Sequence, residues 1–124
     1  MRGVIIAIAV VILAGCSRSP EAIYADKPVS HWLKAMDSPD AKERKKAADI
    51  LGNVGPSNPA AIPALIKALD DSEANVRDAA VLALSKLGRV AEKAADALDG
   101  LKSDPDRSVR QHAIQAAKRV RGIK

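Results

Sequence analysis

Apolar side chains recur every three or four positions along most of the chain, which is the spacing of one face of an α-helix. In residues 61–88 two such runs flank the polar segment Asp70-Asp71-Ser72-Glu73. Polar and acidic residues favour a helix start, because they cap free backbone N–H groups and lie near the positive end of the helix dipole. The pattern therefore predicts two helices joined by a turn, which is a helical hairpin.

The same reading extended along the chain predicts six helices and no β-strand. Prolines near predicted helix starts and glycines after the second helices of the first two hairpins agree with it. The expected helices are residues 28–37, 41–54, 60–70, 73–88, 92–102 and 106–121.

A period of 33 residues relates the three hairpins. Arg44, Arg77 and Arg110 are 33 positions apart, and each is followed after three positions by an alanine. A helical period of this length is typical of a solenoid, in which stacked units share one core. Other columns with the same spacing are Trp32, Leu65 and Leu98; Leu51, Leu84 and Ala117; and the acidic Asp40, Glu73 and Asp106.

The motif of the second unit resembles the HEAT-like repeats of the phycobilisome-lyase type and of related armadillo-fold proteins. It consists of Asp71, Val76, Arg77, Ala80 and the closing Leu87-Gly88, and the similarity extends over about residues 28–121. The resemblance implies an all-α fold, a right-handed α-α superhelix of three hairpins at about residues 28–55, 60–88 and 92–121. It implies a binding surface rather than any particular activity.

In similar repeats an arginine at this position commonly reaches an acidic residue in the turn between helices. The resemblance therefore implies that the arginine column forms a structural ladder along the stack. The alternative is that the column contacts a ligand. The candidate acidic partners of Arg44, Arg77 and Arg110 are Asp37, Asp70, Asp71 and Asp104.

The beginning of the chain has the pattern of a lipoprotein signal. An apolar run of ten residues, 4–13, is too short to cross a bilayer, which needs about 20, but it suits the centre of a secretory signal. The segment that follows resembles the bacterial lipobox, which implies cleavage before Cys16 and acylation of its thiol. An ordinary signal with an unrelated cysteine is the alternative. The lipobox residues are Leu13, Ala14, Gly15 and Cys16.

We therefore expect a signal peptide at residues 1–15, a polar tether at 16–27 and the repeat domain at 28–124. Two or more acyl chains would hold the protein on the periplasmic side of a bacterial envelope membrane. Ser17 follows the cysteine at a position that directs sorting in similar enterobacterial lipoproteins. This resemblance favours the outer membrane over the inner membrane.

The formal net charge is +5 at pH 7, and the surplus lies near the C-terminus. Residues 107–124 contain six basic side chains and no acidic one. Arg107, Lys118 and Arg121 are candidate contacts for an anionic partner, such as lipid headgroups or an acidic protein face. The alternative is that these cations favour the helix C-terminus and keep the last unit soluble.

The residue types needed for catalysis do not come together in the sequence. His31 and His112 lie in the first and last predicted helices, and Cys16 is expected to carry lipid. We therefore predict no catalytic, metal or cofactor site. With Trp32 and Tyr24 as the only aromatic residues, stacking of nucleic-acid bases is not expected, and no small-molecule substrate is evident.

The leading hypothesis is a non-enzymatic adaptor that binds an unidentified protein partner near an envelope membrane. The alternatives are a lyase-like accessory or maturation factor that clasps a substrate protein, and a structural lipoprotein that associates with itself.

Overall fold

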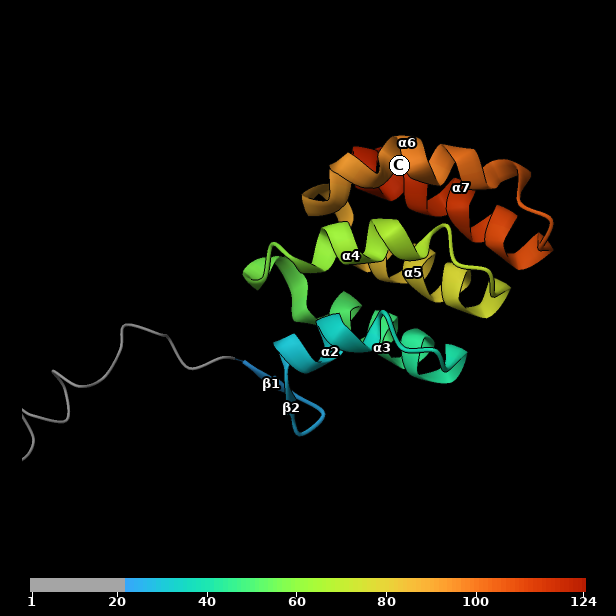
Figure 1. Ribbon diagram of the computed structural model, residues 1–124. Helices are drawn as coiled ribbons and strands as arrows, with labels where there is room; N and C mark the ends of the chain where they lie inside the picture. The colour runs from blue at the N-terminus through green and yellow to red at the C-terminus, as the bar shows by residue number, and fades with distance from the viewer. Residues whose placement is uncertain (1–21) are drawn as a thin grey trace, which may run out of the picture.

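Three pairs of helices stack side by side in the computed structural model, which describes residues 22–124 apart from the Pro56 side chain (Figure 1). This arrangement confirms the predicted all-α solenoid of helical hairpins. The pairs are α2 (Val29–Ala35) with α3 (Ala41–Val54), α4 (Ala61–Ala68) with α5 (Ala74–Leu87), and α6 (Ala95–Gly100) with α7 (Arg107–Arg121).

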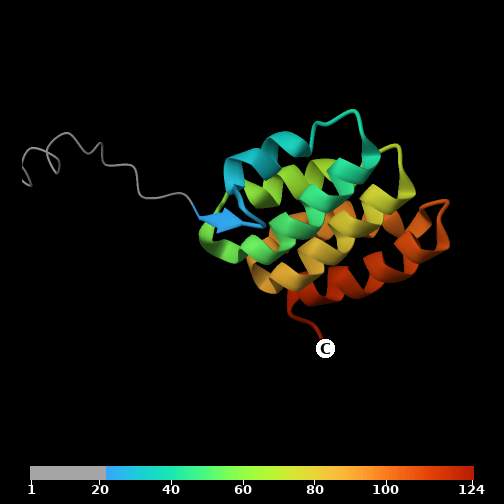
Figure 2. The same ribbon diagram turned by 90° about the horizontal axis from the view of Figure 1, so that it is seen from below.

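The second helix of each pair begins after a residue of the acidic column. Asp40, Glu73 and Asp106 are the N-caps of α3, α5 and α7. The carboxylate of Asp40 accepts the N–H of Lys42 at 2.9 Å, and that of Asp106 accepts the N–H of Val109 at 3.0 Å. These bonds satisfy backbone donors that have no partner inside the helix. Seen from below, α3, α5 and α7 lie next to one another in a row (Figure 2).

The passage from α5 to α6 differs from the predicted helix at 92–102. Gly88 turns the chain with a φ of 62°, and residues Gly88–Ala94 form the 3₁₀ helix η2. Within η2, Ala91 has φ −96° and ψ 24°, which is outside helical geometry. The α-helix therefore begins later than expected, and a further 3₁₀ turn, η3 (Leu101–Ser103), ends the segment.

The prediction that the chain has no β-strand is wrong. The end of the segment predicted as a polar tether, residues 16–27, takes part in a short β-hairpin. β1 (Ile23–Tyr24) pairs antiparallel with β2 (Lys27–Pro28) through a two-residue turn whose φ angles are 49° and 65°. The indole N–H of Trp32 donates to the carbonyl oxygen of Tyr24 at 2.9 Å. A buried indole needs such an acceptor, so the hairpin packs against α2. Strands of two residues are too short to leave an alternating pattern in the sequence.

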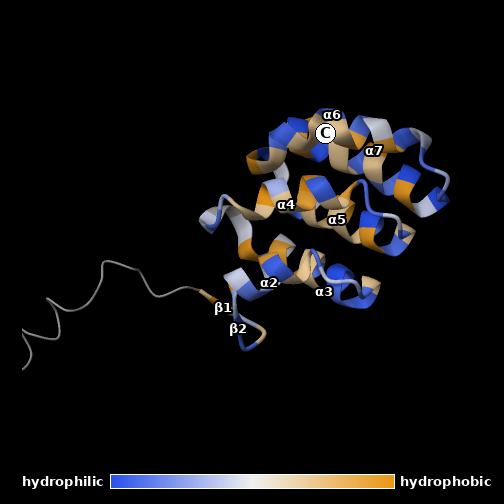
Figure 3. Cartoon of the chain, viewed as in Figure 1, coloured by the Kyte–Doolittle hydropathy of each residue, from blue (hydrophilic) through white to orange (hydrophobic). Residues whose placement is uncertain are grey.

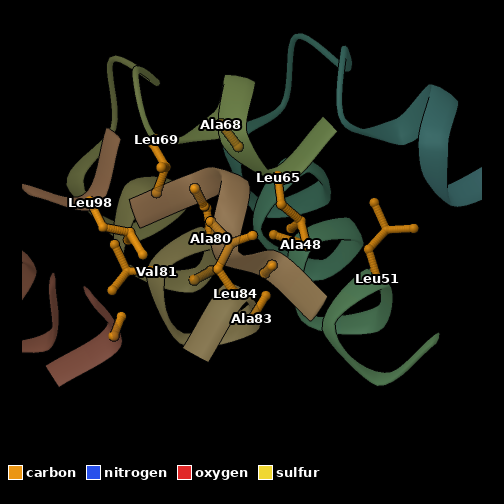
Figure 4. Close-up of a cluster of buried hydrophobic side chains, with 14 of the residues drawn as sticks. Ala48, Leu51, Leu65, Ala68, Leu69, Ala80, Val81, Ala83, Leu84 and Leu98 are labelled. Atoms are coloured by element: carbon orange, nitrogen blue, oxygen red, sulfur yellow. The ribbon is translucent and has the colours of Figure 1, made fainter. Parts of the chain in front are cut away.

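A single apolar core runs through the three units (Figure 4). The predicted core columns are buried, including Trp32, Leu65 and Leu98, and many of the remaining core residues are alanines. Figure 3 shows hydrophilic residues at the ends where α3, α5 and α7 begin, all on one side of the molecule. Within residues 22–124, no helix is long and apolar enough to cross a membrane.

Candidate functional site

The arginine column lies where neighbouring units meet. Each arginine is the fourth residue of its helix, close to the turn that joins the two helices of its unit. Because α3 contacts α5 and α5 contacts α7, an arginine side chain at this position can reach both its own turn and the turn of the next unit.

Arg44 uses the two edges of its guanidinium on two different units. Nη1 donates to the carbonyl oxygens of Ser38 at 2.9 Å and Pro39 at 3.2 Å, which belong to its own turn. Nε and Nη2 donate to the two carboxylate oxygens of Asp71 at 2.8 and 3.0 Å, 27 positions further along the chain. Such a bidentate pair fixes both the distance and the orientation of the partners.

Arg77 repeats this geometry at the next interface. Its Nη1 donates to the carbonyl oxygens of Asp71 at 2.9 Å and Ser72 at 3.2 Å. Its Nε and Nη2 donate to the carboxylate of Asp104 at 2.8 and 3.0 Å. Two successive interfaces are thus linked by the same pair of bidentate contacts.

The two carboxylates of this ladder are also held by their own turns. Asp71 accepts the backbone N–H of Glu73 at 3.0 Å, and Asp104 accepts that of Asp106 at 2.8 Å. Their side chains are 12% and 4% exposed. The hydrogen bonds from the arginines and the turn hold the pKa of both carboxyls below its ordinary value, although burial opposes this. The same pairs raise the pKa of Arg44 and Arg77.

Among the described residues, Arg110 makes the contacts to its own turn but not those to a next unit. Its Nη1 donates to the carbonyl oxygens of Asp104 at 2.7 Å and Pro105 at 3.0 Å. Its Nε and Nη2 donate to no residue in the range 22–124, since no described unit packs on the outer face of α7.

Of the four acids proposed for the ladder, the structure brings Asp71 and Asp104 to the arginines and leaves the other two apart. Asp70 is exposed and bonds to no arginine of the column. Asp37 pairs instead with Lys67 at 3.1 Å, and both side chains are largely in solvent. The first unit has Ser38 in the column of Asp71 and Asp104. No arginine of a preceding described unit faces it.

The three cationic candidates on α7 have different surroundings. Arg107 and Lys118 are exposed and form no ion pair with another described residue. Arg121 pairs with Asp99, with its Nη1 3.1 Å from Oδ1, and Lys102 reaches the same carboxylate at 2.7 Å. The bonds from Arg121 and Lys102 hold the pKa of Asp99 well below its ordinary value. The charge of Arg121 is thus already paired inside the protein, with Asp99 and, at 3.6 Å, with Asp96.

The family model for HEAT repeats matches residues 29–118, which include all three units. The chain belongs to the HEAT repeat family. This confirms the HEAT-like resemblance drawn from the second unit. HEAT repeats generally mediate protein–protein interactions, so a protein partner is the expectation for this chain. No curated protein matches the chain.

A shallow groove crosses the row formed by the second helices of the HEAT units. It has a volume of about 360 Å³. Leu82 lies in it with 42% of its surface exposed, and His112 at its edge is 2.6 Å from a carboxylate oxygen of Asp78. The hydrophobic pattern did not predict this groove, because Leu82 lies off the apolar stripe of α5 and the lining residues come from three different units. Its other lining residues are Asp49, Ala83, Ser85, Lys86, Gln115 and Arg119.

Within residues 22–124 no three His, Cys, Asp or Glu side chains are grouped closely enough to hold a metal ion. The predicted lipobox, Leu13 to Cys16, lies outside the described residues.

Proposed function

We propose that this HEAT repeat protein is a non-enzymatic adaptor, anchored by lipid on Cys16 to the periplasmic side of a bacterial envelope membrane, the outer membrane in preference to the inner. Its stacked helices bind a protein partner and hold it near the membrane. The observation that carries the proposal is the groove over α3, α5 and α7, which combines an exposed leucine with a polar rim. Specific protein interfaces have this composition, with an apolar centre and hydrophilic surroundings.

The rigidity of the surface supports the proposal. The groove extends over helices of three successive units, and the bidentate pairs of Arg44 and Arg77 fix the position of each unit relative to the next. A surface that is already ordered loses little entropy on binding, which favours affinity.

The placement of the first unit fits an anchor that precedes it. The β1–β2 hairpin packs on α2, and α7 lies at the opposite end of the stack (Figure 1). A lipid upstream of β1 would therefore place the first unit nearest the membrane and leave α7 facing away from it.

Crosslinking in intact bacterial cells tests the proposal. The unmodified protein is expected in the membrane fraction, with acyl chains on Cys16 by mass spectrometry and a reproducible crosslinked protein. Cys16→Ser should lose the acyl mass and the membrane association. An unmodified Cys16 thiol in the mature protein would contradict the anchor, and a wild-type protein that crosslinks to nothing would contradict the adaptor role.

A second pair of variants tests the groove itself. Leu82→Glu replaces the exposed leucine of the groove with a charged residue and is expected to abolish the crosslink. Val90→Glu makes the same kind of change at another exposed apolar residue, in η2 and outside the groove, and should leave the crosslink intact. Equal capture by both variants would contradict the assignment of the groove. A covalent change in the captured protein would instead support a maturation factor.

A further inference from the structure

The guanidinium of Arg110 is oriented in the same way as those of Arg44 and Arg77. In all three, Nη1 is held by two carbonyl oxygens of the preceding turn, at distances between 2.7 and 3.2 Å. In the first two, the remaining edge, Nε and Nη2, binds an aspartate of the next unit. Because the turn already fixes Arg110, its free edge presents two parallel donors in the geometry that a carboxylate accepts.

The surface around Arg110 corresponds to the one that α3 and α5 bury against the next unit. Ala48 and Val81 are fully buried there, whereas Ile114, 33 positions after Val81, is 39% exposed on α7. Small residues at two further positions are replaced on α7 by exposed cations. Arg107 follows Ala41 and Ala74 in its column, and Lys118 follows Gly52 and Ser85.

We propose that this outer face of α7, formed by Arg107, Arg110, Ile114 and Lys118, binds an acidic helix start of the partner protein, with one aspartate carboxylate held by Nε and Nη2 of Arg110. The proposal rests on the adaptor role for the existence of a partner, and it adds the surface and the chemistry of the contact.

The two turns that already bind Arg44 and Arg77 show which sequence motif can bind Arg110. Both carry an aspartate, any residue, and an acidic N-cap followed directly by a helix, as in Asp71-Ser72-Glu73 and Asp104-Pro105-Asp106. In both, the aspartate also accepts the N–H of the residue two positions later. That bond turns the carboxylate toward the arginine of the preceding unit. The partner is expected to have such a turn, with an apolar residue placed to cover Ile114.

A second copy of the chain does not have this chemistry at its first unit. Its residue in the aspartate column is Ser38. Lys34 shares a column with Lys67, which forms an ion pair with Asp37 of the unit before it. Lys46 shares a column with His112, which contacts Asp78 of the unit before it. A copy stacked on α7 in the same way would place these lysines opposite Ser103 and Gln111, which share columns with Asp37 and Asp78 but carry no charge. Arg107 and Lys118 lie on the same helix, and like charges oppose that contact. An anionic lipid surface is also disfavoured, because the anchor of the proposed adaptor enters at the other end of the stack.

A peptide with the sequence of residues 71–81, stapled on its solvent face to keep it helical, serves as the probe. It would present to α7 the acidic turn and the first half of α5. It ends before Ala83, because α7 carries Lys118 in the column of Gly52, the glycine that Ala83 packs against on α3. We expect the full-length protein to bind this peptide at least about tenfold more tightly than the same peptide with asparagine in place of its first aspartate. Arg110→Gln should abolish this preference. Arg110→Lys should also lose most of it, since an ammonium group cannot form two parallel bonds to a carboxylate.

Arg107→Gln is the matched control, because it removes the same charge from the same face. It should weaken both peptides equally and keep the preference for aspartate. Circular dichroism of each variant checks that the fold is retained. Equal binding of the two peptides by the wild-type protein, no binding up to about 1 mM, or a preference that persists in Arg110→Gln would each overturn the proposal.

The crosslinking experiment separates this proposal from the adaptor role. Capture of the partner that survives Arg110→Gln would contradict the α7 contact and leave the adaptor standing. A wild-type protein that captures nothing would contradict the adaptor, whatever the peptide does.

Discussion

A single arginine per unit connects the period of the sequence to the geometry of the stack. Its planar guanidinium has two usable edges, and the structure uses one for the unit's own turn and the other for the next unit. The Arg77 and Asp104 side chains are 13% and 4% exposed, so the pair is largely removed from water. A buried charge of this kind is stable only while its partner is present.

The arginine column could be predicted from the sequence, but its partners could not be chosen. Asp70 and Asp71 are adjacent, and they point in different directions once the turn has a defined path. Only the structure shows that the arginine reaches 27 positions forward, to Asp71, and not to the neighbouring acid. The open edge of Arg110 follows from the same geometry and could not be seen in the spacing alone.

Stability should fall in acid because of the ladder carboxyls. The folded-state pKa of Asp71 and Asp104 lies below the ordinary 3.8, so these groups contribute stability above that value, which is lost as the pH falls through the folded pKa. Urea unfolding measured from pH 7 down to about pH 2 should show the loss beginning below about pH 5. Asp104→Asn should flatten this fall, whereas Asp70→Asn should leave it unchanged. The same slope in Asp104→Asn and wild type would contradict the assignment.

At the scale of helices, hydrophobic spacing was sufficient to find each helix, and the bounds of α3 agree with the predicted 41–54. Spacing was insufficient where short-range geometry decides, as in the two-residue strands and in η2. It also gave no sign of why α3 and α5 come so close. A Cβ atom on Gly52 would lie 2.8 Å from the Cβ of Ala83 and 2.9 Å from its Cα, so a glycine is needed at this contact.

Gly52→Ala should therefore destabilise the protein, although alanine is the better helix former. The added methyl would push α3 away from the backbone of α5, and such overpacking costs about 1 to 3 kcal/mol. Gly100→Ala is the matched control, because its Cβ would meet nothing within 4 Å. It should be neutral or raise the free energy of unfolding by up to about 1 kcal/mol. Urea denaturation measures both, and a Gly52→Ala protein as stable as Gly100→Ala would refute the close approach.

At the scale of the whole molecule, three thin units share one core built largely from alanine, valine and leucine. The columns of the sequence predicted which side chains enter it, since a buried position repeats every 33 residues. The sequence could not show which exposed side chains gather into one surface. The groove around Leu82 and the face around Arg110 form only when the units are stacked.

Leu84→Ala should destabilise the whole stack rather than one unit. Leu84 is fully buried in the central unit, and truncation of such a residue costs about 2 to 5 kcal/mol. Leu82→Ala removes the same atoms two positions away, where the side chain is 42% exposed, and should cost much less. Thermal unfolding followed by circular dichroism compares them. Similar melting temperatures for the two variants would argue against the core assignment.

The central claim is that each arginine binds an aspartate of the next unit and so locks the stack. A double-mutant cycle with Arg77→Gln and Asp104→Asn measures this most directly, through the free energies of unfolding of the four proteins. We expect a coupling energy of about 1 to 3 kcal/mol between the two sites. The exposed pair of Lys67 and Asp37, which joins neighbouring units at 3.1 Å, should give nearly additive effects in the same experiment. Additive effects of Arg77→Gln and Asp104→Asn would contradict the claim.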